Sequence, residues 1–253
     1  MKLDAAFLMT FFAVFVRATA MLLVAPLIGQ AVPVNVRVLL GAVISLALTP
    51  VIQPYIGELP TSTMELVLFA GREVLMGAII GLTIQLVLSA LQAAGALADL
   101  QMGIASAQLF NPMMGGASTP LAQFKFWLGL ALIFLLQGHH MMFQAFMTSF
   151  ELGVRTAPDL IAQMGDFVGF ISQIASLALQ ISAPVFAVSF IIDVAAGFIN
   201  KAVPQTQPFL LALPGKLAAG MLALAFGLPA IVLGVQAGLR MGFDALGQLM
   251  GGS

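Results

Sequence analysis

Six apolar segments, each long enough to cross a lipid bilayer as a helix, constrain this chain more than any other feature. Only 8% of the 253 residues are charged and 61% are hydrophobic, whereas a soluble domain carries about 25% charged residues. The chain is therefore expected to be an all-α integral membrane protein with about six long apolar helices, several of them as bent helical hairpins. The six segments cover residues 5–28, 38–56, 64–98, 124–150, 167–200 and 217–240.

The N-terminal segment has some features of a cleavable signal peptide. Lys2 precedes the apolar run, and "ATA" at 18–20 resembles a cleavage site. However, Arg17 lies inside the run, and apolar residues continue as far as Ile28. These features favour a retained helix over residues 5–28.

Two of the segments are longer than a simple membrane crossing requires. As helices, residues 64–98 and 167–200 would each reach about 50 Å, against a hydrocarbon core of about 30 Å. Tilt can absorb part of the excess, and Pro184 is expected to kink the second segment. The alternative is a pair of long, bent helices that belong to hairpins and stand partly outside the lipid.

Several classes of function fit this composition poorly. The net charge of −1 provides no basic surface for nucleic acid, and the absence of cysteine removes thiolate metal ligands and cysteine nucleophiles. His139 and His140 are adjacent, so on a helix they do not converge on one metal ion as an i, i+4 pair can. The chain has only two histidines and lacks a G-x-S-x-G motif, which argues against a serine hydrolase. We expect no enzyme activity, no metal and no cofactor.

Charged and amide side chains inside the apolar segments are candidate sites. A charge at mid-helix in lipid costs roughly 2.5–3.5 kcal/mol on insertion scales, so each needs a partner, a water-filled cavity or a place outside the lipid. Interhelical or intersubunit ion pairs, a conduction path, and helix ends that lie elsewhere than expected remain three explanations. The candidates are Arg17, Arg72, Glu73, Gln85, Gln92, Asp99, Asp193 and Lys201.

Two patterns refine these candidates. Arg72 and Glu73 are adjacent and point about 100° apart on a helix, which makes them poor partners for each other. Gln85, Gln92 and Asp99 recur every seven residues and form a polar seam, suited either to interhelical hydrogen bonds or to a wet passage or subunit junction. Small residues at GxxxG spacing (Gly77 and Gly81; Gly234, Gly238 and Gly242) favour close helix packing, within the chain or against other subunits.

The uncharged connection "GIASAQLFNPMMGGASTP" at 103–120 interrupts the apolar helices. Its glycines make the backbone permissive, and its adjacent methionines can fill an irregular space without fixing it. Missing charge lowers the cost of desolvation. Non-helical backbone at membrane depth is tolerated where protein or a water-filled cavity surrounds it. A segment of this kind is expected to sit inside protein and to be able to move.

An ordered set of motifs resembles a known family. "APLIGQAVPVNVRVLLG" (25–41), "AGALADLQMG" (94–103), "NP" (111–112), "QGHH" (137–140) and "GFINKAVPQTQPF" (197–209) occur in the order and with the spacing of the FliR family of flagellar biosynthetic proteins and its virulence-secretion counterparts. The resemblance covers nearly the whole chain. It implies a subunit of the export gate of a bacterial type III secretion system, in the inner membrane at the flagellar basal body.

The resemblance also implies partners and an internal division of the single membrane domain. FliP and FliQ would be gate partners, FlhB and FlhA associated proteins, and unfolded flagellar proteins the cargo. Residues 1–166 would form a FliP-like part and 167–235 a FliQ-like hairpin, with "VPQTQP" at its turn. Residues 104–119 would form a plug in the channel, where many relatives have an acidic residue in place of Asn111. The plug candidates are Gly103, Phe110, Asn111, Pro112, Met113, Met114, Gly115 and Gly116.

Two other classes compete with an export gate. A small-molecule secondary transporter would explain Pro184, Asp193 and the glycine-rich connection, but no inverted repeat of matching short segments is present. A purely structural membrane subunit would have no contact with a channel. A transporter should be stable alone or as a small oligomer, whereas a gate subunit should copurify with its partners in a large complex.

Overall fold

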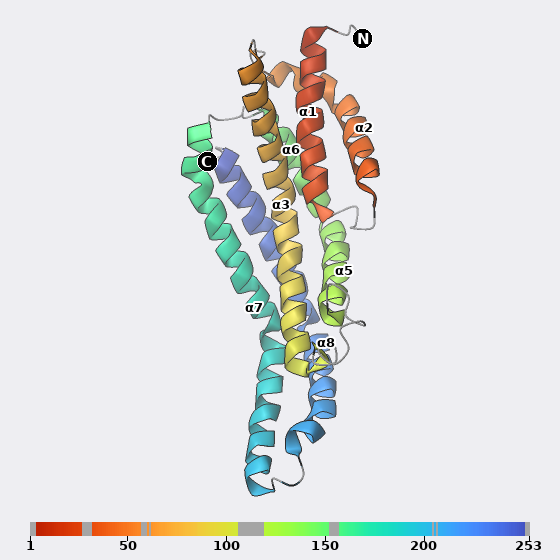
Figure 1. The fold of residues 1–253 in the computed structure, drawn as a ribbon, viewed down its shortest axis with the longest axis vertical. Helices are drawn as coiled ribbons and strands as arrows, with labels where there is room; N and C mark the ends of the chain where they lie inside the picture. The colour runs from red at the N-terminus through yellow and green to blue at the C-terminus, as the bar shows by residue number, and fades with distance from the viewer. Residues whose placement is uncertain are drawn as a thin grey trace. The chain divides into compact units, whose positions relative to one another are not determined.

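The computed structural model of the chain is helical wherever it assigns regular structure (Figure 1). It describes residues 4–26, 32–56, 60, 62–105, 119–151, 157–203, 205 and 207–250. The elements are α1 (Ala5–Val24), α2 (Val34–Ile52), the short 3-10 helix η2 (Gln53–Tyr55), α3 (Thr63–Met102), α5 (Pro120–Leu135), α6 (Gly138–Glu151), α7 (Ala157–Ala202) and α8 (Pro208–Met250).

The prediction of an all-α chain with about six long apolar helices is confirmed. Within the described residues, five helices are long and apolar enough to cross a membrane, and α5 with α6 makes a sixth if that bent pair counts as one span. The expected helix over 217–240 is longer than predicted, because α8 runs from Pro208 to Met250. Pro214 and Pro229 lie inside α8, and the helix continues through both.

The apolar segment 124–150 is divided into two helices that meet at 65°. Gln137 lies between them with φ 58°, in the left-handed region that normally ends a helix. Its N–H donates to the carbonyl of Phe134 at the end of α5, and its own carbonyl accepts from the N–H of His140 at the start of α6. The break is therefore built from local backbone geometry, which a hydropathy pattern does not register.

Three helices exceed the length of a simple membrane crossing. α3 has 40 residues, α7 has 46 and α8 has 43. At 1.5 Å per residue they span about 60–70 Å, roughly twice a hydrocarbon core of about 30 Å. Pro184 lies inside α7, and the helix continues through it.

The chain forms two compact units, and all three long helices contribute to both. The first unit contains Met1–Leu86, Ile133–Ser172 and Leu239–Ser253, and the second contains Val87–Leu132 and Gln173–Gly238. In the first unit α1 and α2 run side by side (Figure 1). Gly41 of α2 lies against Thr19 of α1.

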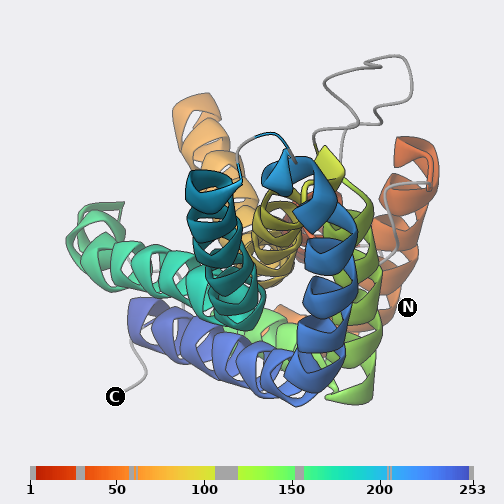
Figure 2. The same cartoon turned by 90° about the horizontal axis from the view of Figure 1, so that it is seen from below.

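In the second unit the two arms of the hairpin formed by α7 and α8 lie next to each other (Figure 2). Gly234 of α8 faces Leu177 and Ile181 of α7, and an added Cβ at Gly234 would come within 3.0 Å of the Ile181 side chain. Gly238 faces Leu177 as well. This glycine pair therefore serves packing within the chain, one of the two roles expected from its spacing.

Candidate functional site

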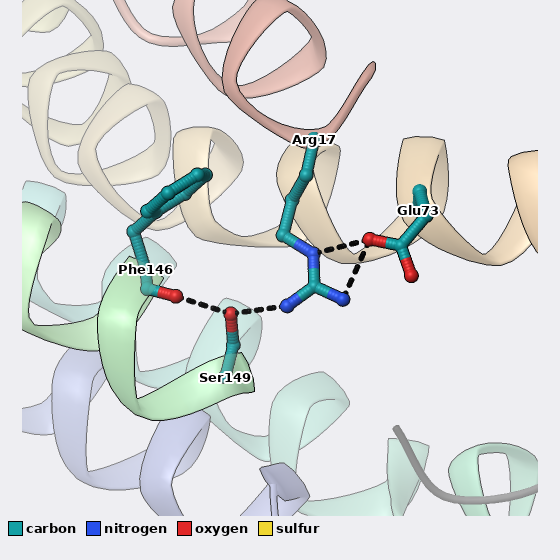
Figure 3. A network of polar contacts seen from close by, with 4 residues as sticks. All are labelled: Arg17, Glu73, Phe146 and Ser149. Atoms are coloured by element: carbon teal, nitrogen blue, oxygen red, sulfur yellow. Dashed lines mark hydrogen bonds and ion pairs between the residues drawn. The ribbon is translucent and has the colours of Figure 1, made fainter. Parts of the chain in front are cut away.

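Arg17 of α1 is the centre of a buried polar cluster in the first unit (Figure 3). Its Nε donates to Oε2 of Glu73 at 2.7 Å, and its Nη2 lies 2.6 Å from the same oxygen. Its Nη1 donates to Oγ of Ser149 at 2.7 Å, and that hydroxyl donates to the carbonyl of Phe146 at 2.6 Å. The guanidinium also lies 3.5 Å from the centre of the Phe150 ring. One arginine thus joins α1, α3 and α6.

Close approach of α1 and α3 makes this geometry possible. A Cβ added at Gly77 would overlap the carbonyl oxygen of Arg17, and one at Gly81 would come within 2.5 Å of the carbonyl oxygen of Met21. Gly77 is one turn after Glu73 on α3, so the same face carries the close contact and the carboxylate. The GxxxG pair is therefore an intrachain packing motif that supports a buried ion pair.

Arg72 and Glu73 face different surroundings, as adjacent helical residues must. Glu73 is buried and turned to Arg17, whereas Arg72 is half-buried with its guanidinium carbon 5.6 Å from the centre of the Phe69 ring. Both ionised members of the Arg17–Glu73 pair are desolvated, so each depends on the other for compensation. The cluster holds helices together and contains no group placed for chemistry on a substrate.

Asp193 of α7 pairs with Lys216 of α8 in the second unit. The Lys216 Nζ donates to both carboxylate oxygens, at 2.9 and 2.8 Å. The Asp193 side chain is 40% exposed and that of Lys216 is 13% exposed. Lys216 was missed as a candidate, although a sequence signal exists. The midpoint of positions 193 and 216 falls at 204.5, inside the turn, so a hairpin places them opposite each other.

The expected polar seam of α3 runs from partly to fully buried positions. Gln85 and Gln92 are half-buried, and Asp99 is fully buried. Oδ2 of Asp99 accepts hydrogen bonds from the backbone N–H groups of Leu121 at 2.8 Å and Ala122 at 3.3 Å. The last member of the seam is therefore engaged with the first turn of α5.

The remaining candidates fall at helix ends or outside the described residues. Lys201 is exposed in the last turn of α7, where a positive charge is favourable to the helix dipole. Gly103 follows α3 with φ 79°, and its N–H donates to the carbonyl of Leu100 at 3.2 Å. The other plug candidates, Phe110 through Gly116, lie outside the described residues.

His139 and His140 form a ring contact at the start of α6. Their ring centres are 4.3 Å apart, and the His139 ring lies 5.2 Å from that of Phe134. Among the residues that the structure describes, no group of three or more His, Cys, Asp or Glu side chains could hold a metal ion. These histidines belong to the packing around the bend between α5 and α6.

Comparison with known proteins gives a family match over almost the whole chain. The family model described as "Bacterial export proteins, family 1" matches residues 8–241. The flagellar biosynthetic protein FliR of Caulobacter vibrioides is 32% identical over 87% of this chain and 88% of its own length. FliR of Bacillus subtilis is 29% identical over 85% of this chain and 84% of its own.

A virulence protein is also similar. The Yop proteins translocation protein T of Yersinia pestis is 29% identical over 86% of this chain and 85% of its own length. The long apolar helices agree with these matches. The chain therefore belongs to family 1 of the bacterial export proteins, the FliR family of non-enzymatic membrane components of type III protein export.

Proposed function

We propose that the chain is a subunit of the flagellar type III export gate and that its segment 104–119 closes the gate's channel at rest. The single observation that carries this proposal is the match to the bacterial export family over residues 8–241, which includes the whole connection between α3 and α5. That connection has no charged residue, three glycines counting Gly103, and two adjacent methionines. Such a segment can fill a narrow, desolvated passage and still yield to an unfolded chain.

We also propose that FliP-like and FliQ-like subunits cover much of the α7–α8 hairpin. Large apolar side chains are exposed along both arms, including Phe190 (67%), Phe198 (71%), Leu211 (71%) and Phe226 (84%). The two helices reach about 65–70 Å, whereas lipid tails can cover about 30 Å of a helix. Apolar surface beyond that length needs protein to cover it. FlhB and FlhA are expected to bind the assembled gate, and residues 167–235 to act as its FliQ-like part.

Shortening the segment tests the closure role directly. Deletion of about four to six residues within 106–118 is expected to leave the gate assembled, because the helices that hold the complex lie outside the deletion. It is expected to make the membrane permeable to ions and small solutes, because the closed passage loses its filler. The measurement is membrane conductance, with the yield of the purified complex followed in parallel. An assembled complex with an unchanged ion barrier contradicts the assignment.

A matched pair of substitutions separates charge from size. Gly115→Asp is expected to impair export, since a carboxylate in a desolvated passage is costly. Gly115→Asn has nearly the same shape without the charge and is expected to impair export less. Equal effects of the two substitutions would show that added bulk or lost backbone freedom, and not desolvation of charge, limits the passage.

The similarity to the Yersinia translocation protein keeps a virulence secretion system as the second candidate. A strain that lacks the chain distinguishes the two candidates. Loss of flagellin export would indicate the flagellar system, and loss of virulence-effector export would indicate the virulence system. A small-molecule transporter is disfavoured by the export family match. Purification from membranes distinguishes it further, because a gate subunit should elute in a large complex with other gate proteins.

A further inference from the structure

The first turn of α5 is capped by a residue from another helix. Pro120 begins α5 and has no N–H, so Leu121 and Ala122 carry the first free N–H groups. Both donate to Oδ2 of Asp99, at 2.8 and 3.3 Å. Thr119 occupies the local capping position, yet its Oγ1 has no hydrogen-bond partner in the part of the chain described. The cap therefore comes from position 99 of α3, 22 residues before Leu121.

A close backbone approach brings α3 within reach of this helix end. A Cβ added at Gly95 would overlap the backbone of Ala122, whose nitrogen lies 2.5 Å from the added atom. Gly95 is one turn before Asp99, so both residues lie on the face of α3 that meets α5. Ala122 is buried, as is Ala98 beside Asp99. A larger residue at position 95 would push α5 away from the Asp99 carboxylate.

A buried lysine takes part in the same junction. Lys125 of α5 is fully buried, and its Nζ donates to the carbonyl of Ala94 on α3 at 3.2 Å. The carboxylate of Asp99 also interacts favourably with the Lys125 charge. A buried charge is costly unless it is compensated, and the Asp99 carboxylate offsets part of this cost for Lys125. The Asp99 side chain of α3 accepts hydrogen bonds from the backbone of α5, and the Lys125 side chain of α5 donates one to the backbone of α3.

We propose that Asp99 and Lys125 are positioning residues which clamp together the two ends of the segment 104–119. α3 ends at Met102 and α5 begins at Pro120, so the clamp joins the helix that enters this segment to the helix that leaves it. The clamp holds the end of α3 against the start of α5 and so fixes the two stems of the segment. For its effect on sealing, this inference rests on the proposed closure role of the segment.

The clamp can be tested with a single thiol, because the chain contains no cysteine. Ala122→Cys places it at a position that is 4% exposed, and Leu100→Cys places a reference thiol at one that is 65% exposed. In the purified gate, the thiol at position 122 should react slowly with a maleimide relative to the reference thiol. Asp99→Asn removes the charge of the cap and should raise the relative rate about tenfold, as expected for the loss of a charged hydrogen bond. Gly95→Ala should do the same.

A control variant and a double-mutant cycle show whether the effect is specific. Asp193→Asn removes the carboxylate charge of the Asp193–Lys216 pair, which lies elsewhere in the second unit, and it should leave the thiol at position 122 protected. Lys125→Met should raise the relative rate as Asp99→Asn does. The double variant Asp99→Asn/Lys125→Met should react more slowly than the two single effects multiplied together, because it leaves no uncompensated buried charge. Multiplicative rates would show that Lys125 acts independently and would remove it from the clamp.

Hydrogen exchange of the unmodified gate tests the same point without relying on variants that could fail to assemble. The amides of Leu121 and Ala122 should exchange as slowly as those in the middle of α5, although first-turn amides normally lack a helical acceptor. Fast exchange of these two amides overturns the clamp. Continued protection of the thiol at position 122 in the Asp99→Asn and Gly95→Ala gates overturns it as well.

The same measurements separate the clamp from the closure role of the segment. A gate in which Asp99→Asn exposes the thiol at position 122 without any rise in conductance supports the clamp and contradicts the closure role. A gate that leaks when the segment is shortened, but keeps this thiol protected in the Asp99→Asn variant, supports the closure role and contradicts the clamp.

Discussion

The guanidinium of Arg17 lies 2.6 Å from the carboxylate of Glu73, and both side chains are buried although they are 56 positions apart in the chain. An ion pair in this environment contributes little net stability over an apolar contact of the same shape, but removing one partner leaves a buried charge. The pair therefore specifies which faces of α1 and α3 meet.

Glu73→Gln is expected to destabilise the fold by about 3–5 kcal/mol, because the Arg17 charge loses its compensation in a dry interior. Arg17→Met combined with Glu73→Gln should be less destabilising than either single change. Thermal unfolding of the purified gate, analysed as a double-mutant cycle, measures this coupling. Additive effects would mean that the two side chains do not depend on each other.

Gly77→Ala is expected to separate α1 from α3, since a Cβ there meets the rigid backbone oxygen of Arg17. Overpacking of this kind costs about 1–3 kcal/mol or more when backbone must move. Gly71 is the matched control on the same helix, because an added Cβ there has nothing within 4 Å. Gly71→Ala should be neutral or stabilise the helix by up to about 1 kcal/mol. Complex yield and melting temperature distinguish the two, and similar losses for both would refute the close-approach argument.

Asp193→Ala is expected to lower the yield of the assembled complex, because Lys216 then lacks its partner within the hairpin. The pair is partly exposed, so the direct effect on folding should be about 1 kcal/mol or less. Lys216→Met in the Asp193→Ala background should restore part of the yield by removing the unpaired charge. Normal assembly and normal export with Asp193→Ala alone would show that the hairpin does not need the pair.

Gln137→Gly is expected to stabilise the protein by about 1 kcal/mol, since a non-glycine residue in the left-handed region carries a steric cost of about that size. Gln137→Val should destabilise it, because a β-branched residue tolerates positive φ least. Melting temperatures should therefore fall in the order glycine, glutamine, valine. A higher melting temperature with glutamine than with glycine would mean that the Gln137 side chain contributes more than its backbone conformation costs.

Single cysteines placed along α3, α7 and α8 should reveal regions of protection longer than one membrane crossing. The helices span about 60–70 Å, so both lipid and partner subunits are expected to cover them. Labelling in the assembled gate should give protected blocks well beyond the roughly 20 residues of a single crossing. Labelling of a chain stripped of partners should leave protected only the part in lipid. If each helix shows one protected block of about 20 residues both with and without partner subunits, the helices are ordinary membrane spans.

Hydropathy and motif order predicted the helical membrane class, the family and the positions of the polar residues that need partners. Segments as apolar as 5–28 and 64–98 have one stable solution in lipid, which is a helix that satisfies its own backbone hydrogen bonds. The insertion cost of Arg17, Glu73 and Asp193 required compensation, so the sequence alone indicated that these residues need partners. The excess length of two segments was visible in the sequence as well.

The tertiary structure decided which groups compensate one another. Glu73 pairs with Arg17 and not with its neighbour Arg72, and this choice depends on the face of α3 that meets α1. Asp99 caps α5 in place of the local Thr119, because Gly95 lets two backbones touch. A linear pattern records how apolar each position is and which face of its own helix it occupies. It does not record the rotation and separation of helices distant in sequence, and the reach of a buried charge to its partner depends on those two quantities.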